Sequence, residues 1–382
     1  MIDYTAVGPG AACPVGSVDW IRRLALGPSL LGPLAIVAVG TVGKATAQDP
    51  QPLVFADEQR QLVLKELTAI GSMNGEHDAF GRIMSLAIDS RGRVIVADDL
   101  SHDLRVFELT GEFVATVGRS GEGPGEFSSP WQVQVGPDDS LYVWDPGRAA
   151  ISVFGPDYEF IRRFLVPPGW TVNSMIVHPG PEIVVSVSGT GELLPIKILS
   201  GDGNVTAEAG PPMPQRDLAG FEDSLLGGSL SRTHDGYVYS QKSPYAVWQL
   251  DEQLGTVSVC HGRPEWTTNP EEVVVRSDRG VGLRWNRFSH SVSILPLPSG
   301  HLLNTVLMPE TDQRLLHVLG EGCRVVSELL LDIPVRPLAV VDDRLVAVRS
   351  LAYPEVVIYN MTWRDAKPAA RGPPSAHPGS PS

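Results

Sequence analysis

Short apolar runs separated by polar or glycine-containing turns follow one another along most of the chain. The first group lies at residues 85–88, 93–97, 104–107 and 113–117, with turns at 90–92 and 110–112. Runs this short, rich in β-branched residues, favour strands over helices. No stretch of ten or more residues beyond the N-terminal segment keeps a convincing helical period. The pattern therefore predicts a unit of four short antiparallel strands.

This four-stranded unit repeats after 47 residues without a gap. The matching pairs include Gly71 with Gly118, Phe80 with Phe127, Val96 with Val143, Asp98 with Asp145, and Phe107 with Phe154. A sheet unit that recurs at a fixed period cannot bury its apolar faces alone and must pack against its neighbours. Four antiparallel strands in a period of this length are typical of one blade of a β-propeller.

The later units keep the order of strands and turns but share fewer identical residues. They are marked by apolar runs at 182–186, 237–240, 302–306 and 345–348. The 303 residues from Gln61 to Trp363 correspond to about 6.4 periods of 47, so six blades fit, with inserts at 210–227 and 264–286. The last unit lacks an obvious fourth strand. We predict that residues 62–70 supply it and close the ring, since closure removes open sheet edges.

The first two units resemble the NHL-repeat six-bladed propellers of the secreted bacterial type. The resemblance is carried by GRSGEGPGEF at 118–127, Pro130, LYVWD at 141–145 and ISVF at 151–154. It implies an all-β fold, a six-bladed β-propeller of four-stranded antiparallel blades closed by an N-terminal strand. The family includes binding modules, sensor domains and a few enzymes, so the resemblance does not fix a function.

The amino-acid composition fits this fold and argues against some classes of partner and of site. The 39 glycines and 33 prolines suit many turns, and charged residues make up only 19%. The net charge of −14 argues against a nucleic-acid partner, because binding to phosphates requires positive charge. Three cysteines are too few for a disulfide scaffold or a four-thiolate zinc site.

The N-terminus predicts export. Arg22 and Arg23 precede the uncharged run 24–43, and the run is followed by Ala45-Thr46-Ala47, a typical cleavage site. We expect an extension and signal peptide at 1–47, a linker at 48–60, the propeller at 61–364 and a disordered tail at 365–382. The expected location is periplasmic or extracellular. The alternative keeps residues 24–43 as a membrane anchor, and only then is a membrane expected as a partner.

The compartment also bears on the two cysteines of the mature chain, Cys260 and Cys323. In an oxidising compartment they could pair. The alternative is two separate buried thiols, because sequence alone does not give the geometry of the pair.

Asp98 and Asp145 occupy equivalent positions just after the second strand of the first two units. In one interpretation each carboxylate braces the neighbouring turn through backbone hydrogen bonds. In the other, Asp98, Asp145 and Asn304 are calcium ligands at a rim of the axial channel. The aligned residues Ser186 and Ser240 are poor ligands for a hard cation, so the ring of ligands is incomplete.

The insert at 264–286 holds Trp266, Arg284 and Trp285 among further arginines. An aromatic and arginine-rich loop on an acidic protein is typical of a binding surface. The alternative is a loop that only covers one mouth of the channel. Arg349, at a strand end of the sixth unit, is the fourth binding candidate.

These observations favour an exported, monomeric binding or scaffold module without a cofactor. Its partner would be a protein, peptide or glycan, recognised by loops on one rim while the blades stay rigid. The alternative is a metal-dependent hydrolase or lyase of the lactonase type, with calcium in the axial channel. The sequence Gly-x-Ser-x-Gly does not occur, so the nucleophile of an α/β-hydrolase is not indicated.

Overall fold

The computed structural model describes residues 50–56, 60–189, 194–212, 227–242, 245–262, 272–277, 280–285, 290–308 and 313–365. For 272–277 and 280–285 it describes the backbone alone. The regular elements within these residues are β-strands, as the short apolar runs predict. The expected leader at 1–47 and residues 366–382 of the expected tail lie outside them. No helix in the described part of the chain is long and apolar enough to cross a membrane.

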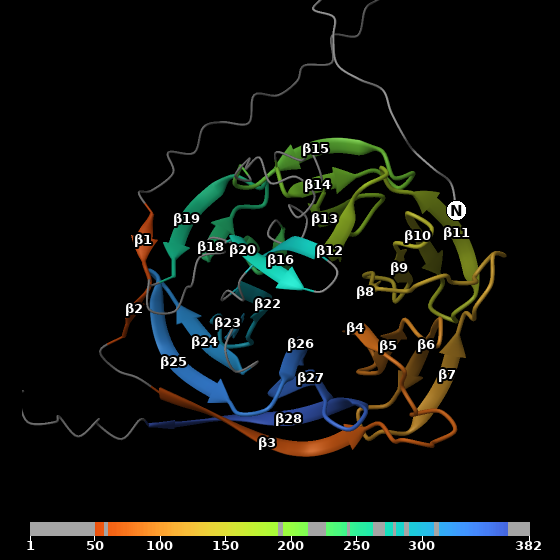
Figure 1. The fold of residues 1–382 in the computed structure, drawn as a ribbon, viewed down its shortest axis with the longest axis horizontal. Helices are drawn as coiled ribbons and strands as arrows, with labels where there is room; N and C mark the ends of the chain where they lie inside the picture. Colours follow the sequence, from red (N-terminus) through yellow and green to blue (C-terminus); the bar gives the residue numbers. More distant parts are fainter. Residues whose placement is uncertain are drawn as a thin grey trace, which may run out of the picture. The chain divides into compact units, whose positions relative to one another are not determined.

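Six sheets stand around a common axis, and the first strand of each lies nearest to it (Figure 1). Blade 1 contains β4 (Ile83–Ile88), β5 (Val94–Asp98), β6 (Asp103–Phe107) and β7 (Phe113–Val117). Blade 2 contains β8 (Gln132–Val135), β9 (Leu141–Asp145), β10 (Ala150–Phe154) and β11 (Phe160–Leu165). Blade 3 contains β12 (Thr171–Val177), β13 (Ile183–Ser188), β14 (Ile196–Leu199) and β15 (Val205–Ala209).

The other three blades follow the same plan. Blade 4 contains β16 (Gly228–Thr233), β17 (Gly236–Gln241), β18 (Ala246–Leu250) and β19 (Thr256–His261). Blade 5 contains β22 (His290–Pro296), β23 (Leu302–Leu307), β24 (Arg314–Gly320) and β25 (Arg324–Leu331). Blade 6 contains β26 (Val335–Val341), β27 (Arg344–Ser350), β28 (Pro354–Asp365) and β3 (Arg60–Ile70). The fold is a six-bladed β-propeller of antiparallel blades.

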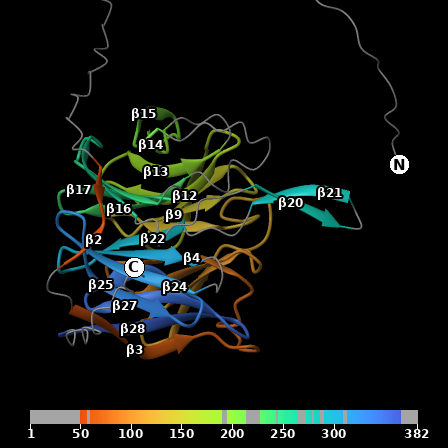
Figure 2. The same ribbon diagram turned by 60° about the vertical axis from the view of Figure 1, so that its left-hand side comes forward.

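The insert between blades 4 and 5 contains a hairpin of β20 (Glu272–Ser277) and β21 (Gly280–Trp285). Among the described strands these two pair only with each other (Figure 2). The first strands of the blades contact one another in a closed cycle, β4, β8, β12, β16, β22, β26 and again β4. The wall of the axis is therefore continuous.

The ring is closed by β3, the segment predicted for this purpose. It pairs antiparallel with β28, with Ile70 opposite Val356 at one end and Arg60 opposite Asp365 at the other. Leu62 of β3 is only 1% exposed and packs in an apolar cluster with residues of blades 5 and 6. The predicted closure by an N-terminal strand is confirmed.

Apolar side chains fill the interfaces between blades. One cluster joins Leu104 of blade 1 to Val143 and Phe154 of blade 2, and all three are fully or almost fully buried. Each such side chain contributes about 1.5–3 kcal/mol when it leaves water. Gly118 has φ +76°, and a Cβ atom there would lie 2.2 Å from the ring of Phe127, so the repeated glycine makes room for the repeated phenylalanine.

Residues 50–56, within the expected linker at 48–60, contain two short strands. They include β1 (Gln51–Pro52), which pairs parallel with β19, and β2 (Val54–Phe55), which pairs parallel with β25. Leu53 between them is completely buried, and its backbone N–H donates to His261 O. The buried Leu53 anchors the segment, while Val54 and Phe55 stay exposed and the adjacent Pro52 suits a sheet edge.

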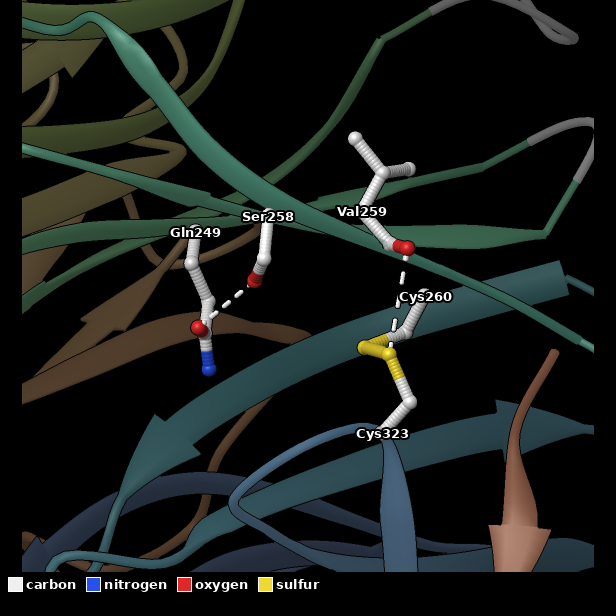
Figure 3. Close-up of a disulfide and its surroundings, with 5 residues drawn as sticks. All are labelled: Gln249, Ser258, Val259, Cys260 and Cys323. Atoms are coloured by element: carbon white, nitrogen blue, oxygen red, sulfur yellow. Dashed lines mark hydrogen bonds between the residues drawn. A yellow bond between two sulfur atoms is a disulfide. The ribbon is translucent and has the colours of Figure 1, made fainter. Parts of the chain in front are cut away.

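The disulfide joins the same two blades. Cys260 of β19 and Cys323, which directly precedes β25, are bonded, with their Cα atoms 5.4 Å apart (Figure 3). That separation lies within the range that disulfides require. Both cysteines pack in one apolar cluster with Leu53, so the segment from β1 to β2 covers the disulfide. Of the two alternatives, the structure has the paired cysteines.

Candidate functional site in the axial channel

A cavity of about 390 Å³ lies on the axis, and the first strands of all six blades contribute to its wall. Its polar lining includes the side chains of Gln132, Gln134, Asn173, Lys242, His290 and Arg336. None of the described residues that line it is Asp or Glu. Its volume is in the range of small-molecule sites, towards the lower end.

Serine side chains tie the wall together. Equivalent positions of the first strands carry Ser85, Ser174, Ser229 and Ser293 in blades 1, 3, 4 and 5. Three of them accept a backbone N–H from the next blade: Ser85 from Val133 at 2.9 Å, Ser174 from Leu230 at 3.1 Å, and Ser229 from Ile294 at 3.3 Å. These bonds join adjacent inner strands and hold the cavity in one shape.

Two donors on the wall have no partner within the described part of the chain. Ser293 is 4% exposed, and its hydroxyl makes no hydrogen bond there. The buried indole N–H of Trp131 is also unpaired there. Buried polar groups are normally hydrogen-bonded, so both groups are exceptions, but neither atom has surface exposed to the cavity.

Lys242 places a positive charge on the wall at the end of β17. Its backbone N–H donates to Gly227 O at 3.1 Å, just as Asp99 in blade 1 donates to Arg82 O at 3.0 Å. Blade 4 thus has an ammonium group where blade 1 has a carboxylate. Burial lowers the pKa of Lys242. No carboxylate of the described residues lies within ion-pair distance of it to oppose this effect.

Arg336 supplies a second cation from β26. Its Nη2 atom donates to Ile83 O at 3.0 Å and to Met84 O at 2.7 Å, which ties blade 6 to blade 1. Burial, together with the charge of the nearby Arg314, lowers the pKa of Arg336 to about 10. The guanidinium therefore stays protonated at neutral pH, held by carbonyl oxygens rather than by a carboxylate of the described chain.

The wall is divided into two chemical halves. Blades 4, 5 and 6 supply Lys242, His290 and Arg336, whereas blades 1 to 3 supply amides, Trp131 and methionines. Hard cations such as calcium require several carboxylate or carbonyl oxygens. Amides, hydroxyls and two cations instead suit a polar or negatively charged molecule.

The first metal candidate, Asp98, is engaged by the backbone around it. Its carboxylate accepts the N–H groups of Gly81 at 2.7 Å and Arg82 at 2.9 Å, and the Ser101 hydroxyl at 2.8 Å. Burial raises the pKa of this carboxyl, but the hydrogen bonds outweigh burial and the net pKa is lowered. Asp98 therefore braces the loop that enters blade 1 and the turn that leaves β5.

Asp145 does the same in blade 2, where it accepts the N–H groups of Ser128 at 2.7 Å and Ser129 at 3.1 Å. In blade 4, the strand register places Gln241 at the position that Asp98 holds in blade 1. The sequence comparison aligns Ser240 with Asp98 instead. Within the described residues no group of three or more His, Cys, Asp or Glu side chains could hold a metal ion.

The third metal candidate, Asn304, belongs to a buried network in blades 4 and 5. Its Oδ1 atom accepts from Ser291 at 2.8 Å and lies 3.0 Å from Ser240 Oγ, and its Nδ2 donates to the Tyr245 hydroxyl at 2.6 Å. Burial raises the pKa of Tyr245, so that hydroxyl stays neutral. Asn304 is thus committed within the protein and is not brought together with Asp98 or Asp145.

None of the four binding candidates is among the described residues that line the cavity. Trp266 falls outside the described residues, and Arg284 and Trp285 end β21, of which the backbone alone is described. Arg349 of β27 pairs with Glu66 at 2.7 Å and with Glu355 at 2.9 Å. The hydrogen bond from Arg349 to Glu66 and the pairing with Glu355 outweigh burial and raise the pKa of Arg349, which links the three outer strands of blade 6.

A second hollow of about 720 Å³ lies outside the axis, against β11 and the turn at 202–204. Its wall includes Leu165, which is 71% exposed, and Arg162, whose guanidinium donates to Gly201 O. Fewer polar side chains converge here than in the axial cavity. We therefore treat the axial cavity as the candidate site.

Comparison with known proteins agrees with the fold. A family model described as a 6-bladed beta-propeller matches residues 77–169, which span blades 1 and 2, where the 47-residue repeat is clearest. The chain is a six-bladed β-propeller. No curated protein sequence matches it.

Two solved structures share this propeller architecture. One is a member of the DUF4221 family from Bacteroides vulgatus, with 10% identity and a TM-score of 0.60 over 81% of this chain and 100% of that one. The other is a candidate exported protein from Bacteroides fragilis, with 9% identity and a TM-score of 0.52 over 84% of this chain and 99% of that one. At such identity the similarity shows a common fold and gives no information about a ligand.

Proposed function

We propose that the protein is an exported, non-enzymatic binding module whose ligand occupies the axial cavity. The observation that carries the proposal is the cavity itself, about 390 Å³ and lined by all six blades. Serine bridges between adjacent inner strands fix its wall. A rigid wall favours binding, because little conformational entropy is lost.

Three observations support export. The N-terminal sequence has the pattern of a cleavable leader, with a typical cleavage site after Ala47. The disulfide between Cys260 and Cys323 is of the kind that persists in oxidising compartments. One protein of similar fold is a candidate exported protein. Together they favour the periplasm or the outside of the cell.

The loops on the rim remain part of the proposal. The hairpin of β20 and β21 ends at Trp285, and the next described residue, His290, already lines the cavity. In sequence, the insert with Trp266, Arg284 and Trp285 is therefore followed within five residues by a residue of the wall. Side chains of this insert can select which molecules enter.

The metal-dependent alternative has less support. The carboxylates of Asp98 and Asp145 are satisfied by backbone N–H groups, and Asn304 is engaged in its own network. The described wall of the cavity offers two cations instead of the carboxylates that a calcium site needs.

The proposal is tested by blocking the cavity. Met84 lines it, and Met84→Trp would fill part of its volume. The purified protein is screened by thermal shift against a set of soluble sugars, sugar acids, amino acids and nucleosides. We expect saturable stabilisation by at least one compound class, lost in Met84→Trp and kept in Leu67→Trp, an exposed site on β3. Stabilisation that persists in Met84→Trp, or none with any compound, contradicts the proposal.

A further inference from the structure

We propose that the axial cavity binds a small hydroxylated organic anion, a sugar carboxylate or sugar phosphate, whose negative charge is balanced by Lys242 and Arg336. This inference rests on the proposed binding function and adds the chemical class of the ligand. Both cations line the same cavity. The class combines an acidic group with several hydroxyls, which match the two halves of the wall.

The charge argument begins with Lys242. No ion pair or hydrogen bond of its ammonium group occurs among the described residues, and burial is the one influence on its pKa. Lys242 is half-buried, and partial withdrawal of an unpaired cation from water costs folding free energy. A carboxylate or phosphate in the cavity would remove that cost, because hydrogen bonds between charged groups are the stronger ones.

Arg336 adds to this charge, and no carboxylate of the described residues pairs with it. One of its nitrogen atoms bonds the two carbonyl oxygens of blade 1, which fixes the plane of the guanidinium. The remaining N–H groups belong to a cation whose planar fork suits a carboxylate or phosphate. The whole chain carries a net charge of −14, so a cavity with two cations and no acidic lining residue among those described is a local exception.

The neutral half of the wall favours a hydroxylated body for the ligand. Gln132 and Asn173 lie on adjacent inner strands, where the Gln132 amide donates to Asn173 O at 2.6 Å. Amide groups both donate and accept, as hydroxyls require. Trp131 adds an apolar face to this half of the wall.

The experiment is calorimetric titration of the purified protein with two matched pairs of probes. The pairs are D-galacturonate with D-galactose and glucose 6-phosphate with glucose, each differing in charge while sharing a sugar ring. We expect at least one anion to bind roughly tenfold or more tightly than its neutral partner. The carboxylate and phosphate arms show which acidic group is preferred.

Variants assign the binding to the cavity. Lys242→Met should weaken the affinity for the anion by roughly tenfold or more, and Lys242→Arg should retain most of that affinity. Lys65→Met removes the same charge from an exposed position of β3 and should change nothing. Arg336→Met is a second test, with folding checked by circular dichroism because that residue also bonds blade 1.

The outcomes separate this inference from the binding function. Three outcomes contradict the proposal that the ligand is an anion. They are anion binding that persists in Lys242→Met, equal affinity for charged and neutral partners, and no binding of either anion. If neutral compounds still bind and Met84→Trp blocks them, the binding module stands and only the ligand class is wrong.

Discussion

At the scale of single residues, the site is marked by positive charges that lower the stability of the folded protein. Carboxylates at the blade ends are satisfied by backbone donors, as with Asp98 and Gly81. Lys242 is the contrary case, since it is half-buried without an anionic partner in the described chain. Residues that break a local rule without compensation are frequently functional.

Lys242→Met should therefore stabilise the ligand-free protein near pH 7 by less than about 1 kcal/mol, because the side chain is half-buried and the full cost applies to an unsatisfied polar group that is completely buried. Because the folded-state pKa lies below the ordinary 10.5, the unfolded chain binds more protons between the two values. Stability of the native sequence thus rises as pH rises through that interval, and the advantage of the variant shrinks. Urea unfolding near pH 7 and near pH 10 measures this. A variant less stable than the parent would contradict it.

Sequence reasoning found some of these residues and missed others. The 47-residue period located Asp98 and Asp145 as equivalent positions, and the expectation that they brace turns agrees with their hydrogen bonds. Lys242 and Arg336 were missed because the later blades share few identical residues, so the register that aligns Lys242 with Asp99 becomes visible only in the strand pairing. The sequence did contain one signal of Arg336, because it is the single arginine in the apolar run at 335–341.

At the scale of elements, the strand β3 determines whether the ring is complete. It lies more than 280 residues before its partner β28 in sequence and forms the outer strand of blade 6. Leu62 is buried, and its backbone N–H donates to the Ser327 hydroxyl of blade 5 at 3.0 Å. The strand is thus attached to two blades, through its pairing and through its buried face.

Leu62→Ala should lower the free energy of unfolding by about 2–4 kcal/mol, because it opens a cavity in a packed interface. Leu67→Ala, on the same strand at 49% exposure, should change it by less than about 0.5 kcal/mol. Urea denaturation of both variants followed by tryptophan fluorescence provides the comparison. Equal effects would mean that β3 does not seal the interface.

The elements that sequence predicted well are those with a repeated pattern. The runs at 85–88, 104–107 and 113–117 correspond closely to β4, β6 and β7, and the run at 62–70 to β3. The short strands β1 and β2 escaped prediction, because a two-residue strand has no periodicity and its stability comes from the blade edge that receives it. The six-bladed fold is shown, whereas its assignment to the NHL repeats stays a prediction.

At the scale of the whole molecule, the disulfide and the segment over it join blades 4 and 5 more firmly than packing alone. The bridge spans 63 residues of sequence. A loop of that size gives an upper value of about 4 kcal/mol for the stabilisation, through restriction of the unfolded chain. This contribution exists only where the cysteines are oxidised.

Reduction should therefore lower the free energy of unfolding by about 2–4 kcal/mol, measured by urea denaturation with and without dithiothreitol. The double variant Cys260→Ala and Cys323→Ala serves as the control, since the reductant should leave its unfolding curve unchanged. If the oxidised and reduced proteins unfold at the same urea concentration, the bridge adds no stability and the support that it gives to export weakens.

The position of β3 in the chain also determines when the ring can close during synthesis. During synthesis β3 leaves the ribosome first among the blade strands, yet its partner β28 is the last to appear. Blade 6 can therefore assemble only after the final residues have been made, and translocated if the protein is exported. Pairings between such distant segments form slowly and leave unpaired edges open in the meantime. A chaperone that shields β3 during this interval would raise the yield of the native protein more than one that acts on blades 1 and 2, whose strands are contiguous.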